Sequence, residues 1–183
     1  MVAYASGIFP MPVRPRRLGW WSPERRGVLP LDGLVSSRSL RRSLRRYTVT
    51  IDECFDRVVE ECRTLPRPHG WITREITDAY VRLHHLGLAH SVECWSSTGD
   101  LAGGLYGVSI GGLFAGESMF HREVDASKVA LAHLVDLLGR RPGGLLDVQW
   151  QTPHLERLGV VEMSRTDYIR AVAVAVAAPN AFT

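Results

Sequence analysis

Alternating and continuous apolar segments predict most of the strands in this chain. Residues 47–51 (YTVTI) alternate strictly and are β-branched, which is typical of a half-buried strand. Further apolar segments predict strands over 90–95, 101–110, 113–120, 145–149 and 160–163. Gly111 and Gly112 separate the third and fourth of these six strands and predict a hairpin turn there.

Helical spacing of apolar residues predicts the remaining elements. The expected helices cover 37–46, 126–140 and 153–158, with others running from a cap at Asp52 to about 63, from a cap at Thr73 to about 86, and from Ser164 or Thr166 through 178. A loop containing Pro66, Pro68 and Gly70 separates two of them. Residues 1–32 are rich in proline and glycine, and we expect irregular structure there.

The order of these elements predicts an α/β (α+β) fold. One mixed sheet, mostly antiparallel around the hairpin, would be flanked by helices. The succession of three strands, helix, strand and helix resembles the N-acetyltransferase type of acyltransferase fold. A chain of 183 residues suffices for one domain with a small appendage. We therefore divide it into residues 1–32, the remnant of a small N-terminal domain, and a catalytic domain over 33–183.

Two polar side chains interrupt the apolar strand at 145–149, and one carboxylate interrupts the hairpin. Because side chains alternate along a strand, Asp147 and Gln149 are expected on one face. Glu117 is the carboxylate of the hairpin. A buried carboxylate and amide are costly without partners. Two interpretations remain open: a satisfied structural pair, or the polar floor of an apolar pocket.

Composition narrows the functional classes. The cysteines Cys54, Cys62 and Cys94 are odd in number and contain no C-x-x-C motif, which argues against a disulfide scaffold or a cysteine zinc site and fits a reducing cytosol. We see no signal peptide and no apolar run long enough to span a membrane. The charge is uneven: residues 1–46 hold ten arginines against two acidic residues, although the net charge is only +3. A basic head of this kind indicates a polyanionic partner.

Several motifs, in order and at consistent spacing, resemble the leucyl/phenylalanyl-tRNA–protein transferase family. They are YASGIFPM (4–11), WWSPERRGVLP (20–30), GWITREITDAYVRLHHLGLAHSVECW (70–95), GGLYGV (103–108), LFAGESMF (113–120), ASKVAL (126–131) and LLDVQ (145–149). The resemblance implies an N-acetyltransferase-like domain that moves leucine or phenylalanine from aminoacyl-tRNA to proteins beginning with arginine or lysine. It implies a cytoplasmic enzyme of the N-end rule, with no metal and no cofactor besides the aminoacyl-tRNA. We expect a monomer.

The resemblance also implies roles for particular residues. Those expected around the reacting ester and amine are Asp147, Gln149 and Glu117. Those expected to line the pocket for the aminoacyl side chain are Leu105, Phe114, Leu131, Leu134 and Leu138. Those expected near the terminal adenosine of tRNA are Trp71, Tyr80, Tyr4 and Met11, the last where the family often has tryptophan. Those expected on tRNA phosphates are Arg38, Arg41, Arg42, Arg45 and Arg46, although an arginine-rich helix is often only a solvated face.

Two alternatives from other classes stay open. One is an acyl-CoA-dependent N-acyltransferase, which would need a glycine-containing pyrophosphate turn before the helix at 126, where the chain reads FHREVDAS. The other is a truncated, inactive tRNA-binding module, because the family normally has several tens of residues before YASGIFP. On that comparison we expect part of the N-terminal domain to be missing.

Overall fold

The computed structural model describes residues 1–14, 17–66 and 71–182. Pro68 and Gly70 of the predicted loop lie outside these residues. Contacts divide the chain into two compact units. The first unit contains residues 1–34, 109–115 and 138–183, and the second contains residues 35–108 and 116–137.

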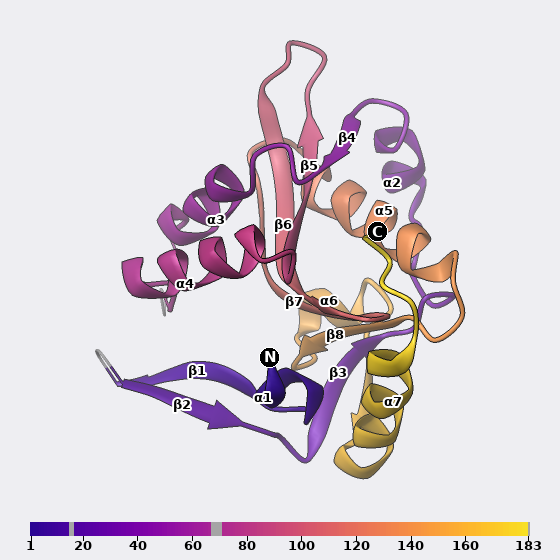
Figure 1. Ribbon diagram of the computed structural model, residues 1–183. Coiled ribbons are helices and arrows are strands. Elements are labelled where there is room, and N and C mark those ends of the chain that lie inside the picture. The colour runs from indigo at the N-terminus through magenta and orange to yellow at the C-terminus, as the bar shows by residue number, and fades with distance from the viewer. Residues whose placement is uncertain (15–16, 67–70, 183) are drawn as a thin grey trace. The chain divides into compact units, whose positions relative to one another are not determined.

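The first unit contains two groups of strands (Figure 1). β1 (Phe9–Arg14) and β2 (Arg17–Trp21) form a two-stranded antiparallel sheet. β3 (Arg25–Leu29) pairs in antiparallel fashion with both β8 (Leu145–Gln149) and β9 (Val161–Ser164). The start of β7 (Leu113–His121) runs parallel to β8. The helices of this unit are α1 (Val2–Ala5), α6 (Pro153–Glu156) and α7 (Arg165–Ala177).

The expectation of irregular structure over residues 1–32 is wrong for three strands and a short helix. Both strands of a two-stranded sheet are edge strands, where a proline lacking its N–H is tolerated, so Pro10 and Pro12 fit in β1. β3 is difficult to recognise from the sequence for a different reason: an arginine, Arg26, lies inside a strand that is buried from its second residue onward. Turn-forming residues were therefore a poor guide to this segment.

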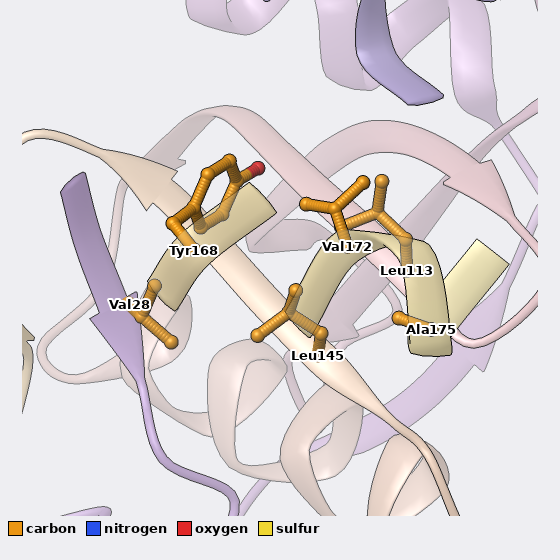
Figure 2. Close-up of a cluster of buried hydrophobic side chains, with 6 residues drawn as sticks. All are labelled: Val28, Leu113, Leu145, Tyr168, Val172 and Ala175. Carbon is orange, nitrogen blue, oxygen red and sulfur yellow. The ribbon is translucent and has the colours of Figure 1, made fainter. Parts of the chain in front are cut away.

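An apolar cluster joins α7 to β3, β7 and β8. Figure 2 shows the side chains of Tyr168, Val172 and Ala175 on the helix beside those of Val28, Leu113 and Leu145 on the strands. Met163, Ala171 and Val176 pack against this cluster. Apolar burial of this kind is the main source of stability for a helix on a sheet, at roughly 25 cal/mol per Å². It also fixes the ring of Tyr168, which the candidate site uses.

The second unit holds the antiparallel strands β4 (Thr48–Ile51), β5 (Ala89–Trp95) and β6 (Leu101–Ile110), followed by the rest of β7. Its helices are α2 (Arg38–Ser43), α3 (Phe55–Thr64), α4 (Arg74–His85) and most of α5 (Ala126–Gly139). Helices α3 and α4 lie side by side (Figure 1). A Cβ on Gly103 of β6 would come within 2.7 Å of Ala126, so glycine permits the close approach of α5.

The predicted mixed and mostly antiparallel sheet flanked by helices is confirmed. The hydrogen-bonded strand order is β4-β5-β6-β7-β8-β3-β9, and β7 and β8 run parallel to each other. The helix expected over 37–46 is shorter, ending at Ser43. Over the described ranges, no helix has the length and apolar character required to cross a membrane.

Candidate active site

A buried carboxylate, Asp147, forms the centre of the candidate site in the first unit. Both Asp147 and Arg26 are almost completely buried, at 0% and 1% exposure. The Arg26 guanidinium donates through Nε to Oδ1 at 2.8 Å and through Nη2 to Oδ2 at 2.7 Å. This two-pronged geometry is the strongest form of the arginine–carboxylate interaction. Asp147 is thus balanced by a cation in β3, the neighbouring strand.

Two further donors complete the shell of Asp147. The hydroxyl of Tyr168 donates to Oδ2 at 2.8 Å, and the backbone N–H of Gln149 donates to Oδ1 at 2.9 Å. Each carboxylate oxygen therefore accepts two hydrogen bonds. A carboxylate accepts about four in total, so this one has no site left for another donor.

The guanidinium of Arg26 is held between two aromatic rings. Its central carbon lies 4.4 Å from the ring centroid of Phe9 and 4.5 Å from that of Tyr168. Its Nη1 donates to the carbonyl of Gly7 at 3.1 Å. Cation–π contacts and a satisfied third nitrogen compensate for burial of the charge. The sequence patterns indicated neither Arg26 nor Tyr168 as part of a site.

Tyr168 is held in its neutral, donating form. Burial raises the pKa of its hydroxyl well above the usual value of 10, and the negative charge of Asp147 raises it further. The hydroxyl therefore remains a proton donor to the carboxylate throughout the physiological range.

The backbone turns sharply directly after Asp147. Gln149 has φ of 62°, in the left-handed region that few residues other than glycine adopt, and the register between β3 and β8 shifts at this point. The alternation that predicted a shared face for Asp147 and Gln149 does not continue across this shift. The chain then passes over Gly27, where a Cβ would lie 2.6 Å from the carbonyl carbon of Trp150. Asp147, through its bond to the Gln149 N–H, stabilises this turn.

The side-chain amide of Gln149 differs from the rest of this network. Its Nε2 is enclosed, and the described residues offer it no hydrogen-bond acceptor. A buried donor without an acceptor is rare and calls for a ligand or water. Among the described residues, the Nε2 of Gln149 is therefore a donor on β8 that has no acceptor.

The other predicted site residues are divided between the units. Glu117 is half-buried on β7 in the second unit. All five residues predicted to line the aminoacyl pocket are buried: Leu105, Leu131 and Leu134 in the second unit, and Phe114 and Leu138 in the first. Phe114 stacks on Phe182 at 5.5 Å between ring centroids. Their joint arrangement around one pocket stays a prediction.

The residues predicted to meet the terminal adenosine differ in exposure. Tyr4 in α1 and Tyr80 in α4 are buried, and Tyr80 contacts the edge of Tyr106. Met11 in β1 and Trp71 before α4 are half-buried. A role for these four residues in base stacking also stays a prediction.

The five predicted phosphate-binding arginines all lie on or directly after α2, at or near the surface. Ser37 caps this helix by accepting the N–H of Leu40. Ser39 donates to Asp125 Oδ2 at 2.6 Å, and Lys128 pairs with Asp125 Oδ1 at 2.7 Å. These donors, that of Lys128 first, lower the pKa of Asp125. Asp125 thereby ties the arginine-bearing helix to the start of α5.

Other sites for chemistry receive little support in the described part of the chain. It contains no cluster of histidine, cysteine and acidic residues suited to a metal ion. Burial raises the pKa of the Cys94 thiol to about 12 and that of Cys54 to about 11, so neither forms a thiolate readily.

The family model described as leucyl/phenylalanyl-tRNA protein transferase matches residues 28–173, and the model of that family's N-terminal domain matches residues 1–24. Proteins named leucyl/phenylalanyl-tRNA–protein transferase are similar. The one from Rubrobacter xylanophilus is 48% identical over 98% of this chain and 94% of its own. Those from Ruegeria sp. and Rhizorhabdus wittichii are 49% and 51% identical, over 98% and 94% of this chain and 86% and 72% of theirs.

One solved structure, L-PGS from Bacillus licheniformis, is similar at 12% sequence identity with a TM-score of 0.45, covering 83% of this chain and 65% of that one. A likeness this weak supports no conclusion about function.

Proposed function

The chain belongs to the leucyl/phenylalanyl-tRNA–protein transferase family, and we propose that it transfers leucine or phenylalanine from aminoacyl-tRNA to the α-amine of proteins that begin with arginine or lysine. The observation that carries this proposal is identity of about half of all positions with named transferases over nearly the whole chain. The acceptor class and the consequence, tagging for degradation under the N-end rule, are part of the proposal.

The reaction requires little covalent chemistry from the protein. The neutral α-amine of the acceptor attacks the carbonyl carbon of the aminoacyl ester, a C–N bond forms, and the C–O bond to the ribose breaks. The amine loses a proton, and the ribose oxygen gains one as it leaves. Because the ester is already activated, positioning and electrostatic stabilisation supply the acceleration. In this proposal Gln149, Asp147 and Glu117 provide the polar surroundings of that step.

The remaining predicted residues bind the aminoacyl-tRNA. The branched and aromatic side chains of the five-residue pocket would hold leucine or phenylalanine, with misfit of a methylene costing about 1–3 kcal/mol. Trp71, Tyr80, Tyr4 and Met11 would contact the terminal adenosine. The α2 arginines would contact phosphates without reading sequence.

The protein is proposed to work as a cytoplasmic monomer with no cofactor other than aminoacyl-tRNA, residues 1–32 being a small N-terminal domain and 33–183 the catalytic domain. Transfer from acyl-CoA is not supported. The carboxylate of Asp125 lies directly before α5, at the helix start where a pyrophosphate would have to bind.

The experiment is a transfer assay with radiolabelled leucyl-tRNA. Peptides that begin with arginine, lysine or alanine, and an acetylated arginine peptide, serve as acceptors. Label should pass to the arginine and lysine peptides and to neither of the others. Equal labelling of the alanine peptide would refute the acceptor class, and no labelling of any peptide would refute the transferase function.

Binding can be tested separately from transfer. Replacing Arg41 and Arg45 by alanine should weaken the affinity for leucyl-tRNA and reduce the slope of log K against log salt by about one to two phosphate contacts. Arg63→Ala, which removes an exposed arginine paired with Glu60 on α3, is the matched control. Unchanged binding by the double variant would refute the phosphate contacts and show that these arginines only form the solvated face of the helix.

A further inference from the structure

The buried network around Asp147 indicates a division of labour that the sequence leaves open. We infer that Arg26 and Tyr168 are positioning residues. They bind Asp147 so that it anchors the turn at Gln149, and the side-chain amide of Gln149 then donates to the carbonyl oxygen of the ester during transfer. This inference rests on the proposed function. It assigns roles to two residues outside the predicted site and changes the role of Asp147.

Geometry argues against direct action of Asp147 on the incoming amine. Its two oxygens already accept four hydrogen bonds, from Arg26 (two), Tyr168 and the Gln149 backbone. An ammonium or amine could approach only if one of these donors left.

The side chain of Gln149 differs from that of Asp147 in its hydrogen bonding. Its backbone is tied to Asp147 in a left-handed conformation, while its Nε2 is enclosed without an acceptor among the described residues. An N–H donor that is fixed in position before the reaction, and that has no partner, can stabilise a negative charge that appears only during the reaction. In ester aminolysis that charge develops on the carbonyl oxygen when the amine attacks. The oxygen becomes a carbonyl again when the ribose hydroxyl leaves with the proton that the amine gives up.

This arrangement explains why Arg26 and Tyr168 are needed. Without the cation, a buried carboxylate would be unstable, and without the carboxylate, the left-handed turn at Gln149 would lose the hydrogen bond that its N–H donates to Asp147. Packing of Arg26 between Phe9 and Tyr168 fixes the guanidinium plane that orients Asp147. Rigid side chains therefore fix the orientation of Asp147 and, through its hydrogen bond, the backbone of Gln149.

The decisive comparison is between Asp147→Asn and the double variant Asp147→Asn/Arg26→Met. The single variant removes the carboxylate that neutralises the buried charge of Arg26, so stability and kcat should both fall. The double variant removes that charge, and the introduced asparagine side chain can still accept from the Gln149 N–H. Its melting temperature should recover, and its kcat should return to within about tenfold of the wild type. Arg170→Met, which removes an exposed arginine on α7, is the control and should change neither quantity.

The outcome that overturns the inference is a double variant that folds like the wild type but transfers no faster than Asp147→Asn, because the carboxylate charge would then act on the reactants. Tyr168→Phe provides a second test if the double variant fails to fold. When the kinetics of this variant are measured well below its melting temperature, its kcat should be about tenfold lower than that of the wild type, with KM for both substrates unchanged. An unchanged kcat would overturn the positioning role of Tyr168.

Gln149→Met tests the donor itself. It preserves length and removes the N–H, so kcat should fall by about 10²–10³-fold with KM for leucyl-tRNA unchanged. A kcat equal to that of the wild type would refute the assignment. Failure of the proposed function is distinguishable, because then the wild type itself would transfer no leucine, whereas failure of this inference leaves the wild-type rate intact.

Discussion

Tyr168→Phe isolates one hydrogen bond of the buried network. The substitution removes only the hydroxyl that donates to Asp147 Oδ2 at 2.8 Å. The ring stays in the apolar cluster of α7, and its contact with the Arg26 guanidinium at 4.5 Å is kept. The change in stability therefore reports the bond to the carboxylate.

The size of the effect follows from the charge of the acceptor. A hydrogen bond to a charged group contributes about 1.5–3 kcal/mol, against about 0.5–1.5 kcal/mol for a neutral pair. For a protein of this length, 1 kcal/mol corresponds to roughly 2–4 °C. We expect Tyr168→Phe to melt about 3–12 °C below the wild type at pH 7. Tyr47→Phe is the comparison. The hydroxyl of Tyr47 donates to the neutral carbonyl of Val124 at 2.9 Å and, at 3.2 Å, to the carboxylate of Glu123, which solvent reaches and screens, so its loss should cost less.

The stability difference between the wild type and Tyr168→Phe should decrease at alkaline pH. Burial and the charge of Asp147 raise the pKa of Tyr168 in the folded protein above the value of about 10 in the unfolded chain. A group with a raised folded pKa contributes stability that is complete below the unfolded pKa and is lost as pH rises. Above pH 10 the advantage of the wild type over Tyr168→Phe should shrink by about 1.4 kcal/mol per pH unit.

Urea unfolding from about pH 7 to about pH 11.5, followed by circular dichroism, measures both quantities. Equal midpoints for wild type and Tyr168→Phe at pH 7 would show that the hydroxyl contributes nothing to the network. A difference that stays constant above pH 10 would show that Tyr168 ionises as easily in the folded state as in the unfolded one.

Two further predictions concern other parts of the chain. The lowered pKa of Asp125 means that its contribution to stability is complete above about pH 4 and is lost as pH falls through the folded pKa. Asp125→Asn should therefore be less stable than the wild type at pH 6, and the difference should shrink as pH falls below about 4 in acid unfolding. A stability difference that stays constant as pH falls below about 4 would contradict the assigned ion pair with Lys128. Gly27→Ala would place a Cβ 2.6 Å from the backbone of Trp150, and we expect a loss of about 1–3 kcal/mol in urea unfolding, whereas Gly139→Ala meets nothing within 4 Å and is the control. Equal stability of the two alanine variants would mean that the chain does not pass closely over Gly27.

The sequence was sufficient to predict an element where its apolar pattern and its flanking turn residues agreed. The strand at 145–149 has the predicted bounds, and the helix predicted over 126–140 ends only one residue earlier. In both cases the apolar pattern agrees with a Pro-Gly-Gly break, which follows the helix and precedes the strand. β3 was missed because its second residue is charged and yet buried. Local patterns cannot show that a charge has a partner more than a hundred residues away.

The same limit applies to the candidate site. A carboxylate inside an apolar strand predicts that Asp147 needs partners, but pattern alone cannot select Arg26 from the arginine-rich N-terminal region. The left-handed turn at Gln149 was also invisible, because glutamine rarely adopts that conformation. Long-range packing, which local propensities do not describe, determines both features.

The most direct measurement is the single-turnover rate of leucine transfer from leucyl-tRNA to a peptide that begins with arginine, for the wild type and for Gln149→Gly. Glycine accepts the left-handed backbone at this position without strain, so the variant should be at least as stable as the wild type. The account predicts transfer by the wild type and a rate about 10²–10³-fold lower for the variant. Equal rates for the two proteins would contradict the role of the Gln149 amide, and no transfer by the wild type would contradict the assigned activity.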